Sequence, residues 1–343
     1  MNPYNVSRPV CIIGLGLIGG SLLRDIAAAH HPVFGYNRST SGARRAAKQG
    51  FDVSNNLPAV LTRAEEEGAL IVVAVPFGAV DSVLDDIAQY APTCGITDVV
   101  SVKTHVYELI RARGMEGRYV GSHPMAGTSQ SGWDNSQEGL FTRAAWAVTY
   151  DFAAELEAAD QRIPESWSAL FNDVVKLIGM VGAEAMPVRV TAHDEAVARV
   201  SHLPHVIAEA LAVVGDHGGI LAQSLAAGSF RDATRVAATR TDLVRQMCEN
   251  NAPALVKALD EFMSQLVAAR ASLAAPTPSI AELADAGYAA RTRLEARSGA
   301  ARRESVSPIK ISPRPVLRLR PGDRGWVSQL RQAESMGGRI EIF

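Results

Sequence analysis

The feature that most constrains this chain is a glycine pattern beside its first apolar run. Residues 10–13 form a short apolar run of strand type, and G-x-G-x-x-G follows at Gly14, Gly16 and Gly19. Residues 22–29 then have helical character. In a strand–turn–helix unit the first glycine makes the tight turn, the second admits a pyrophosphate, and the third lets the helix pack on the strand. Since that helix points its N-terminus at the phosphates, the pattern predicts a dinucleotide-binding fold.

The residues after the second expected strand, 31–36, indicate which dinucleotide binds. An NAD site usually places Asp or Glu there to accept from the ribose 2′-hydroxyl. This chain instead has Asn37-Arg38-Ser39, and a guanidinium suits a 2′-phosphate because it can bind the oxygens bidentately. The sequence therefore predicts NADP. The expected cofactor-binding residues are Gly14, Gly16, Leu17, Ile18, Gly19, Asn37, Arg38, Ser39 and, where a later apolar strand ends, Val75 and Pro76.

The remaining pattern predicts two domains and an extension. Apolar strand-like runs alternate with helical runs to about residue 150, which is typical of a doubly wound parallel sheet covered on both faces. The sequence then becomes alanine-rich, with the residue spacing typical of helices. We expect an α/β fold with a Rossmann-type domain over 1–155, an all-helical domain over 160–297, and an extension of unknown role over 298–343. So much apolar helical surface favours a homodimer through the helical domain.

Composition narrows the class of partner. The formal net charge of −2 argues against nucleic acid as a bulk electrostatic partner. The three cysteines are far apart in the sequence and form no metal or redox motif, so a cytoplasmic setting is expected. From the sequence we expect no apolar stretch long enough to span a membrane, and the polar start resembles no signal peptide.

Two loops at the ends of expected strands carry candidate catalytic residues. His123 precedes Pro124, which holds it in an extended conformation, and an imidazole is a suitable acceptor for a hydroxyl proton. Beside a nicotinamide site we favour this role over a buried structural histidine. Ser101 lies in the other loop, where the alternative is that it caps the next helix.

The helical region adds two polar clusters. One contains His193-Asp194 and Ser201-His202-Leu203-Pro204-His205, for which we favour a substrate-pocket wall over a metal site. The other contains Arg231 and Arg235, four residues apart on one expected helical face, with Asp232 able to pair with one of them. They form either a surface ion-pair row or a clamp for a substrate carboxylate.

In chain order, the segments G-L-G-L-I-G-G-S, D-V-V-S-V-K, G-S-H-P-M-A-G-T-x-x-S-G, S-H-L-P-H and F-R-D-A-T-R-V-A resemble the prephenate/arogenate dehydrogenases of tyrosine biosynthesis. The resemblance covers about residues 9–297. It implies that His123 accepts the proton of the ring 4-hydroxyl, with Ser101 as its hydrogen-bonding partner, and that Arg235 grips the ring carboxylate. It also implies that His205, Thr128 and His202 line the side-chain end of the substrate. It implies no metal.

One departure from the family pattern concerns the pocket wall. Val244 stands where the family often has an aromatic residue, which leaves that wall, and its completion across a dimer, undefined. The sequence also leaves open the choice between prephenate and arogenate. Two alternatives remain: an NADP dehydrogenase of the β-hydroxyacid type, disfavoured because lysine is scarce after Lys176, and a non-enzymatic NADPH-sensing module.

Overall fold

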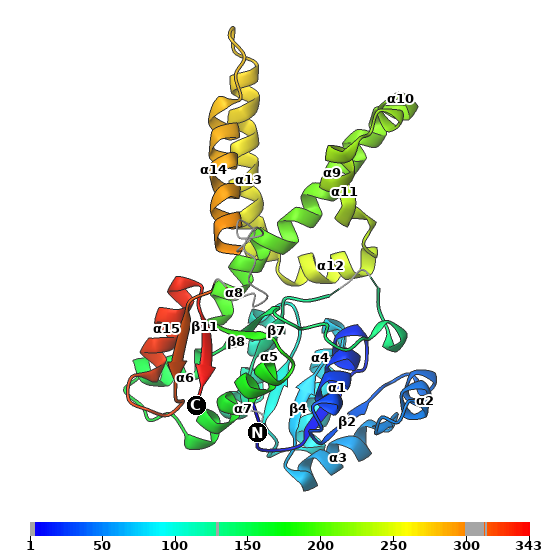
Figure 1. Ribbon diagram of the computed structural model, residues 1–343, viewed down its shortest axis with the longest axis vertical. Coiled ribbons are helices and arrows are strands. Elements are labelled where there is room, and N and C mark those ends of the chain that lie inside the picture. Colours follow the sequence, from blue (N-terminus) through cyan, green and yellow to red (C-terminus); the bar gives the residue numbers. More distant parts are fainter. Residues whose placement is uncertain (1–3, 128–129, 299–311, 313) are drawn as a thin grey trace, which may run out of the picture. The chain divides into compact units, whose positions relative to one another are not determined.

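The computed structural model describes residues 4–127, 130–298, 312 and 314–343 (Figure 1). They form two compact units, each treated separately below. Unit 1 comprises the described residues of Met1–His193 and Pro315–Phe343, and unit 2 those of Asp194–Arg314. The boundary after His193 lies later in the chain than the predicted boundary between residues 155 and 160. The reason is that helix α7 (Glu165–Met180) packs Trp167, Phe171 and Val174 into the core of unit 1.

Unit 1 is built on a six-stranded parallel sheet with strand order β3-β2-β1-β4-β5-β6. Along β1, Val10 and Ile12 join one apolar core while Cys11 and Ile13 join the other, so both faces of the sheet are covered. The expected doubly wound sheet is confirmed. Its strands are β1 (Val10–Ile13), β2 (Val33–Tyr36), β3 (Val53–Ser54), β4 (Leu70–Val73), β5 (Ile96–Asp98) and β6 (Tyr119–Val120). Its helices are α1 (Leu17–Ala28), α2 (Thr40–Lys48), α3 (Leu57–Glu67), α4 (Val80–Tyr90) and α5 (Thr104–Ala112), with short 3₁₀ turns at Phe77–Ala79 and Glu116–Arg118.

A second sheet of unit 1 has the order β7-β8-β9. Strand β7 (Ser122–Pro124) runs antiparallel to β8 (Ala145–Thr149), and β8 runs parallel to β9 (Glu184–Val188). The sequence pattern did not indicate β9, since Pro187 interrupts the run and is tolerated because the strand lies at the sheet edge. The 3₁₀ turn Trp133–Asn135 and helix α6 (Asp151–Ala158) complete this region.

The end of the chain returns to unit 1. It forms β10 (Val316–Leu319), α15 (Trp326–Met336) and β11 (Arg339–Ile342), with β10 and β11 paired in parallel. Helix α15 and strand β11 both pack against β9, and Figure 1 shows α15 and β11 next to each other. Trp326 packs against Trp167 and Phe171, with ring centroids 6.1 and 5.4 Å apart. The described part of the extension from Val316 onward is therefore part of the core of unit 1.

The same extension supplies a carboxylate to helix α8 (Val190–Val197). Glu334 on α15 accepts from Tyr150 Oη and, at 3.0 Å, from the backbone nitrogen of Arg189. Asp151 accepts from the backbone nitrogen of Val190 at 2.9 Å. Two carboxylates thus satisfy N–H groups where α8 begins, a position that also favours negative charge.

The described part of unit 2 is helical. Its elements are the π-helical turn η4 (Ala198–His202), α9 (Leu203–His217), α10 (Gly219–Ser224), α11 (Gly228–Thr234), the 3₁₀ turn η5 (Arg235–Ala238), α12 (Thr241–Asn250), α13 (Ala252–Leu273) and α14 (Ala281–Ser298). Residues 232–250 do not form one continuous helix, because Thr239 and Arg240 adopt extended ψ values of 145° and 130°. The π turn precedes Pro204, whose missing N–H disfavours regular α-helical bonding.

One described helix, Val190–His217, is long and apolar enough to cross a membrane by length and composition alone. The expectation that no stretch reaches that length is therefore wrong. Polar groups within it have protein partners: Asn251 donates to the Asp194 carbonyl at 2.9 Å, and Arg199 pairs with Glu261 at 2.7 Å.

The carboxyl group that caps α8 gives unit 1 a pH-dependent stability. Burial is the main cause that raises the pKa of Asp151 from 3.8 to about 6. The folded chain therefore holds this proton more tightly than the unfolded chain, and the group adds stability as the pH falls from 7 toward 4. Asp151→Asn stays neutral and keeps an acceptor for Val190. We expect it to be more stable than the wild type near pH 7.5, with the gap narrowing by about 1 kcal/mol near pH 5 in thermal melts.

The matched control for this prediction is Glu66→Gln, an exposed carboxylate on α3. Its stability difference from the wild type should stay constant over the same pH range. A constant difference for Asp151→Asn would contradict the prediction.

Candidate functional site

The glycine loop has the shape that a pyrophosphate requires. Gly14 has φ +104°, and a Cβ atom there would lie 2.6 Å from the Ala74 carbonyl oxygen. A Cβ on Gly19 would lie 2.0 Å from the Gly14 oxygen, whereas one on Gly16 would meet nothing within 4 Å. Two glycines are thus required by packing, and the third leaves open space at the N-terminus of α1, whose N-cap makes no side-chain hydrogen bond. These residues fit a bound dinucleotide phosphate.

The other expected cofactor residues lie at neighbouring strand ends. Asn37 follows β2, and its Nδ2 donates to the Leu15 carbonyl at 3.4 Å, which links it to the glycine loop. Ser39 caps α2 by accepting from the Gly42 nitrogen at 3.1 Å, while the Arg38 side chain is exposed. Val75 lies beside Gly14, since a Cβ on that glycine would be 2.9 Å from Val75 Cγ1. The carboxyl ends of β1, β2 and β4 therefore bring these residues together.

A buried ion pair joins the two candidate catalytic loops. Lys103 Nζ donates to Asp98 Oδ1, and both side chains are almost fully buried, at 0% and 1% exposure. Lys103 also donates to the Ser122 carbonyl at 2.8 Å, and Ser122 Oγ donates to the Asp98 carbonyl at 2.6 Å. Because Ser122 directly precedes His123, this network fixes the start of the histidine loop against the end of β5.

The remaining acceptor oxygen of Asp98 is also engaged. Tyr119 Oη donates to Asp98 Oδ2 at 2.5 Å, and the Val100 nitrogen donates to Oδ1 at 2.8 Å. Burial and the Asp98 charge both raise the pKa of Tyr119, so its hydroxyl stays a donor. A buried carboxylate with these donors is compensated, which is the condition under which burial of an ion pair is tolerated.

Ser101 lies between Asp98 and Lys103, and its side chain is half-buried. The alternative role considered for it was capping of α5. That helix has Lys103 at its N-cap and no side-chain capping bond, so Ser101 does not cap it.

His123 lies on β7 opposite Ala147 and is half-buried. Its Nδ1 atom is 2.9 Å from Nε2 of His193, and the two rings meet edge to face with centroids 5.1 Å apart. The sequence pattern had grouped His193 with the helical domain and a pocket wall. The structure instead places it in unit 1, as a hydrogen-bonding partner of His123.

Unit 2 brings two expected substrate residues together. His205 is half-buried on α9, and Arg235 begins the neighbouring turn η5. Burial is the main cause that lowers the pKa of His205, and the positive charge of Arg235 lowers it slightly further. Glu209 and a backbone hydrogen bond with Val236 act in the opposite direction. His205 Nδ1 is buried, and in the part of the chain that the structure describes it meets no hydrogen-bonding partner.

The other expected substrate residues differ in position. His202 is only 1% exposed, and Asn251 Nδ2 lies 3.1 Å from its Nδ1 inside unit 2. Thr128 lies outside the described residues. The expectation that Arg231 and Arg235 share one helical face is wrong, because α11 ends at Thr234 and Arg235 opens a 3₁₀ turn. Both arginines are exposed, and among the described residues neither forms an ion pair with Asp232.

Sequence reasoning missed the roles of Asp98 and Lys103 and the pairing of His193 with His123. The sequence did contain a signal for Asp98 and Lys103: opposite charges at the two ends of a loop that follows an apolar strand. Charged residues in such a buried position are almost always paired. No local signal indicated that His193 would meet His123, since 70 residues separate them in the sequence.

Comparison with known proteins identifies relatives over most of the chain. Residues 22–164 match the family model described as prephenate dehydrogenase, nucleotide-binding domain, and residues 189–296 match prephenate dehydrogenase, dimerization domain. A cyclohexadienyl dehydrogenase from Zymomonas mobilis is 33% identical over 282 residues, which cover 78% of this chain and 89% of that protein.

Two solved structures extend the likeness. A candidate prephenate dehydrogenase from Corynebacterium glutamicum is 56% identical with a TM-score of 0.91, covering 99% of this chain and 100% of that one. The arogenate dehydrogenase from Synechocystis is 26% identical with a TM-score of 0.63, covering 86% of this chain and 98% of that one. The likeness to the Corynebacterium protein therefore includes the C-terminal extension.

Proposed function

Given that this chain belongs to the prephenate dehydrogenase family, we propose that it catalyses the NADP-dependent oxidative decarboxylation of prephenate or arogenate in tyrosine biosynthesis. The activity at the level of prephenate, arogenate or cyclohexadienyl dehydrogenase follows from the family. The names of the relatives differ in substrate, so both substrates stay in the proposal.

The observation that carries the proposal is the placement of His123. Its half-buried imidazole contacts His193, and the Asp98–Lys103–Ser122 network fixes the preceding residue against the end of β5, in the unit that also holds the glycine loop. An imidazole held there can take a hydroxyl proton at a defined nitrogen. Since Nδ1 is engaged by His193, we assign the substrate hydroxyl to Nε2.

The reaction needs a base, an anion-binding group and a hydride acceptor. When bound, the nicotinamide would accept hydride from the carbinol carbon of the ring. His123 takes the hydroxyl proton as the carbinol is oxidised and returns it to the phenolate oxygen. The electrons of the ring–carboxylate bond complete the aromatic ring as carbon dioxide leaves. Ser101 stays a predicted hydrogen-bonding partner of His123 near the nicotinamide; because Nδ1 is engaged by His193, its hydroxyl would meet Nε2, the atom that also takes the substrate proton. We assign Arg235, exposed and without an ion pair among the described residues, to the ring carboxylate. His205 is assigned to the side-chain end of the substrate, where His202 and Thr128 stay predictions.

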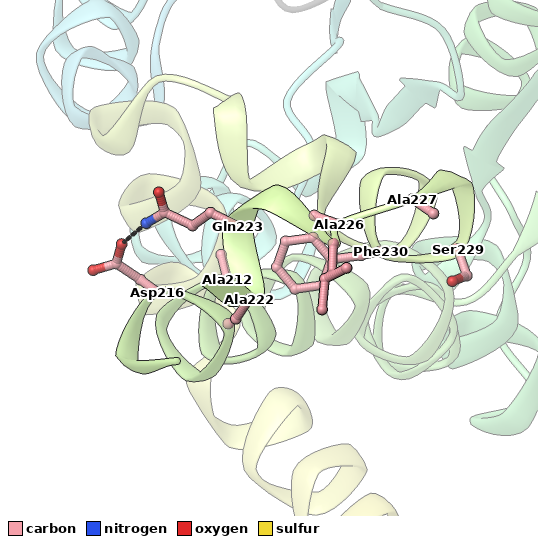
Figure 2. A pocket seen from close by; sticks show the side chains of 10 residues that line it. Ala212, Asp216, Ala222, Gln223, Ala226, Ala227, Ser229 and Phe230 are labelled. Carbon is pink, nitrogen blue, oxygen red and sulfur yellow. Dashed lines mark hydrogen bonds between the residues drawn. The ribbon is translucent and has the colours of Figure 1, made fainter. Parts of the chain in front are cut away.

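Unit 2 supports a homodimer. None of residues 281–297 is buried, so α14 has no buried face in a single chain. A groove of about 430 Å³ lies between α9 and the α10–α11 segment, and Figure 2 shows Phe230 among the alanine side chains that line it. Exposed apolar side chains of this unit include Val213, Val214, Ile220, Leu221, Leu225, Leu266, Val267 and Tyr288. Apolar surface of this extent is typical of an interface, and a second copy is the partner we propose.

The free cysteines Cys11, Cys94 and Cys248 support a cytoplasmic setting.

The base assignment predicts a specific kinetic defect. Wild-type protein mixed with NADP and either substrate should increase absorbance at 340 nm, and His123→Asn should lower kcat by roughly 10²–10⁴-fold, the usual contribution of a positioned acid–base group. The NADP affinity of the variant should stay close to that of the wild type. His105→Asn, an exposed histidine on α5, is the matched control. Near-normal kcat in His123→Asn would exclude it as the base.

The cofactor assignment predicts a preference that depends on one side chain. We expect kcat/KM to be higher with NADP than with NAD, and Arg38→Ala to reduce that ratio by about 1.5–3 kcal/mol, the range for a hydrogen bond to a charged group. Arg44 is an exposed arginine on the following helix, α2, and Arg44→Ala should leave the NADP-to-NAD ratio of kcat/KM unchanged. A wild-type preference for NAD would overturn the assignment.

The carboxylate assignment predicts a binding defect. The substrate carboxylate leaves as neutral carbon dioxide, so a cation that holds it contributes to binding and orientation more than to stabilising developing charge. Arg235→Ala should therefore raise KM strongly with a smaller fall in kcat, and Arg235→Lys should restore binding only in part because a point charge cannot replace a planar fork. Arg231→Ala is the control. A larger effect at Arg231 would show that the other arginine binds the carboxylate.

A further inference from the structure

His123 and His193 form a hydrogen-bonded pair that the family assignment does not explain. Nδ1 of His123 lies 2.9 Å from Nε2 of His193, and the ring planes differ by 72°. His193 is 3% exposed, so the contact is shielded from bulk water. A hydrogen bond between two neutral imidazoles requires one ring to donate and the other to accept, which fixes the tautomers of both.

The direction of this bond decides whether His123 can act as a base. If His193 donates, the neutral His123 ring carries its hydrogen on Nε2 and cannot take a proton there. If His123 donates from Nδ1, its Nε2 atom holds the lone pair. The second arrangement also stabilises the imidazolium that forms when the substrate hydroxyl is deprotonated, since Nδ1–H then points at an acceptor.

We propose that His193 is a positioning residue for His123: its Nε2 accepts the Nδ1 hydrogen of His123, which orients the ring and keeps Nε2 as the proton acceptor. The inference rests on the proposed function, because it needs His123 to be the base. It assigns to a neutral histidine the orienting role that a carboxylate has in hydrolase triads. His193 touches neither substrate nor cofactor in this assignment.

The local structure explains how His193 is held in place. It lies one turn into α8, and its backbone nitrogen donates to the Arg189 carbonyl at 2.8 Å. That first turn is fixed by two carboxylates, Glu334 at the Arg189 nitrogen and Asp151 at the Val190 nitrogen. The helix that carries His193 therefore starts at a defined point of unit 1, and the ring reaches β7 from a buried position.

The test compares two substitutions at residue 193 through the pH profile of kcat/KM. His193→Leu removes the acceptor, so we expect kcat/KM to fall by at least about tenfold and the pKa on the acidic limb to move to lower pH. The Nδ1–H bond that stabilised the imidazolium is then lost. In His193→Gln the side-chain Oε1 can accept the same hydrogen, so activity and the position of the limb should return most of the way to the wild type. NADP affinity and thermal stability, measured on the same preparations, show whether each variant is folded.

Three outcomes separate this inference from its premise. Unchanged activity and an unchanged limb in His193→Leu would overturn the positioning role while leaving His123 as the base. A fall in activity with no shift of the limb and no rescue by His193→Gln would also overturn it, because that is the result of a purely structural defect. The proposed function fails separately, if the wild type does not oxidise either substrate or if His123→Asn keeps full activity. His105→Leu controls for loss of a histidine elsewhere.

Discussion

The arrangement of the two candidate catalytic loops depends on one buried ion pair. Asp98 ends β5, and Lys103 returns to it across the loop that contains Ser101. The same ammonium group holds the Ser122 carbonyl, so a single cation connects two strands that belong to different sheets. A buried pair of this kind contributes little net stability compared with an apolar pair, but removal of either member leaves an uncompensated charge. We infer that the ion pair matters for geometry. It fixes the end of β5 and the start of the His123 loop relative to each other.

The sequence predicted the features whose causes are local. The glycine spacing and the apolar strands defined the sheet, because a tight turn and a two-sided core each leave a short-range pattern. The His-Pro pair marked the loop of His123 for the same reason. Features that depend on distant partners were not predictable. Strand β9 forms only beside β8, and α7 looked like part of a helical domain although its apolar face packs on unit 1. His193 showed no sign of its partner in the sequence.

The π turn at Ala198–His202 illustrates a boundary case. Pro204 is visible in the sequence, but the run around it has helical period, which by itself indicates a regular helix. The chain stays helical and inserts a wider turn, which leaves His202 buried against Asn251 and His205 half-buried near Arg235. A proline inside a helical pattern therefore coincides here with a wider turn, and the chain stays helical after it.

The return of the C-terminal segment to unit 1 has a consequence for biosynthesis. Unit 2 is an insertion in unit 1, and Trp326 and Leu330, which complete the core around Trp167, are made after the whole helical insertion. At a ribosomal rate of roughly 5–20 residues per second, unit 1 waits several seconds or more with its apolar α7 surface uncovered. Nascent chains are thus exposed to aggregation during a defined interval of translation. A chain released early, before α15 is made, would carry a complete glycine loop on a core that cannot close.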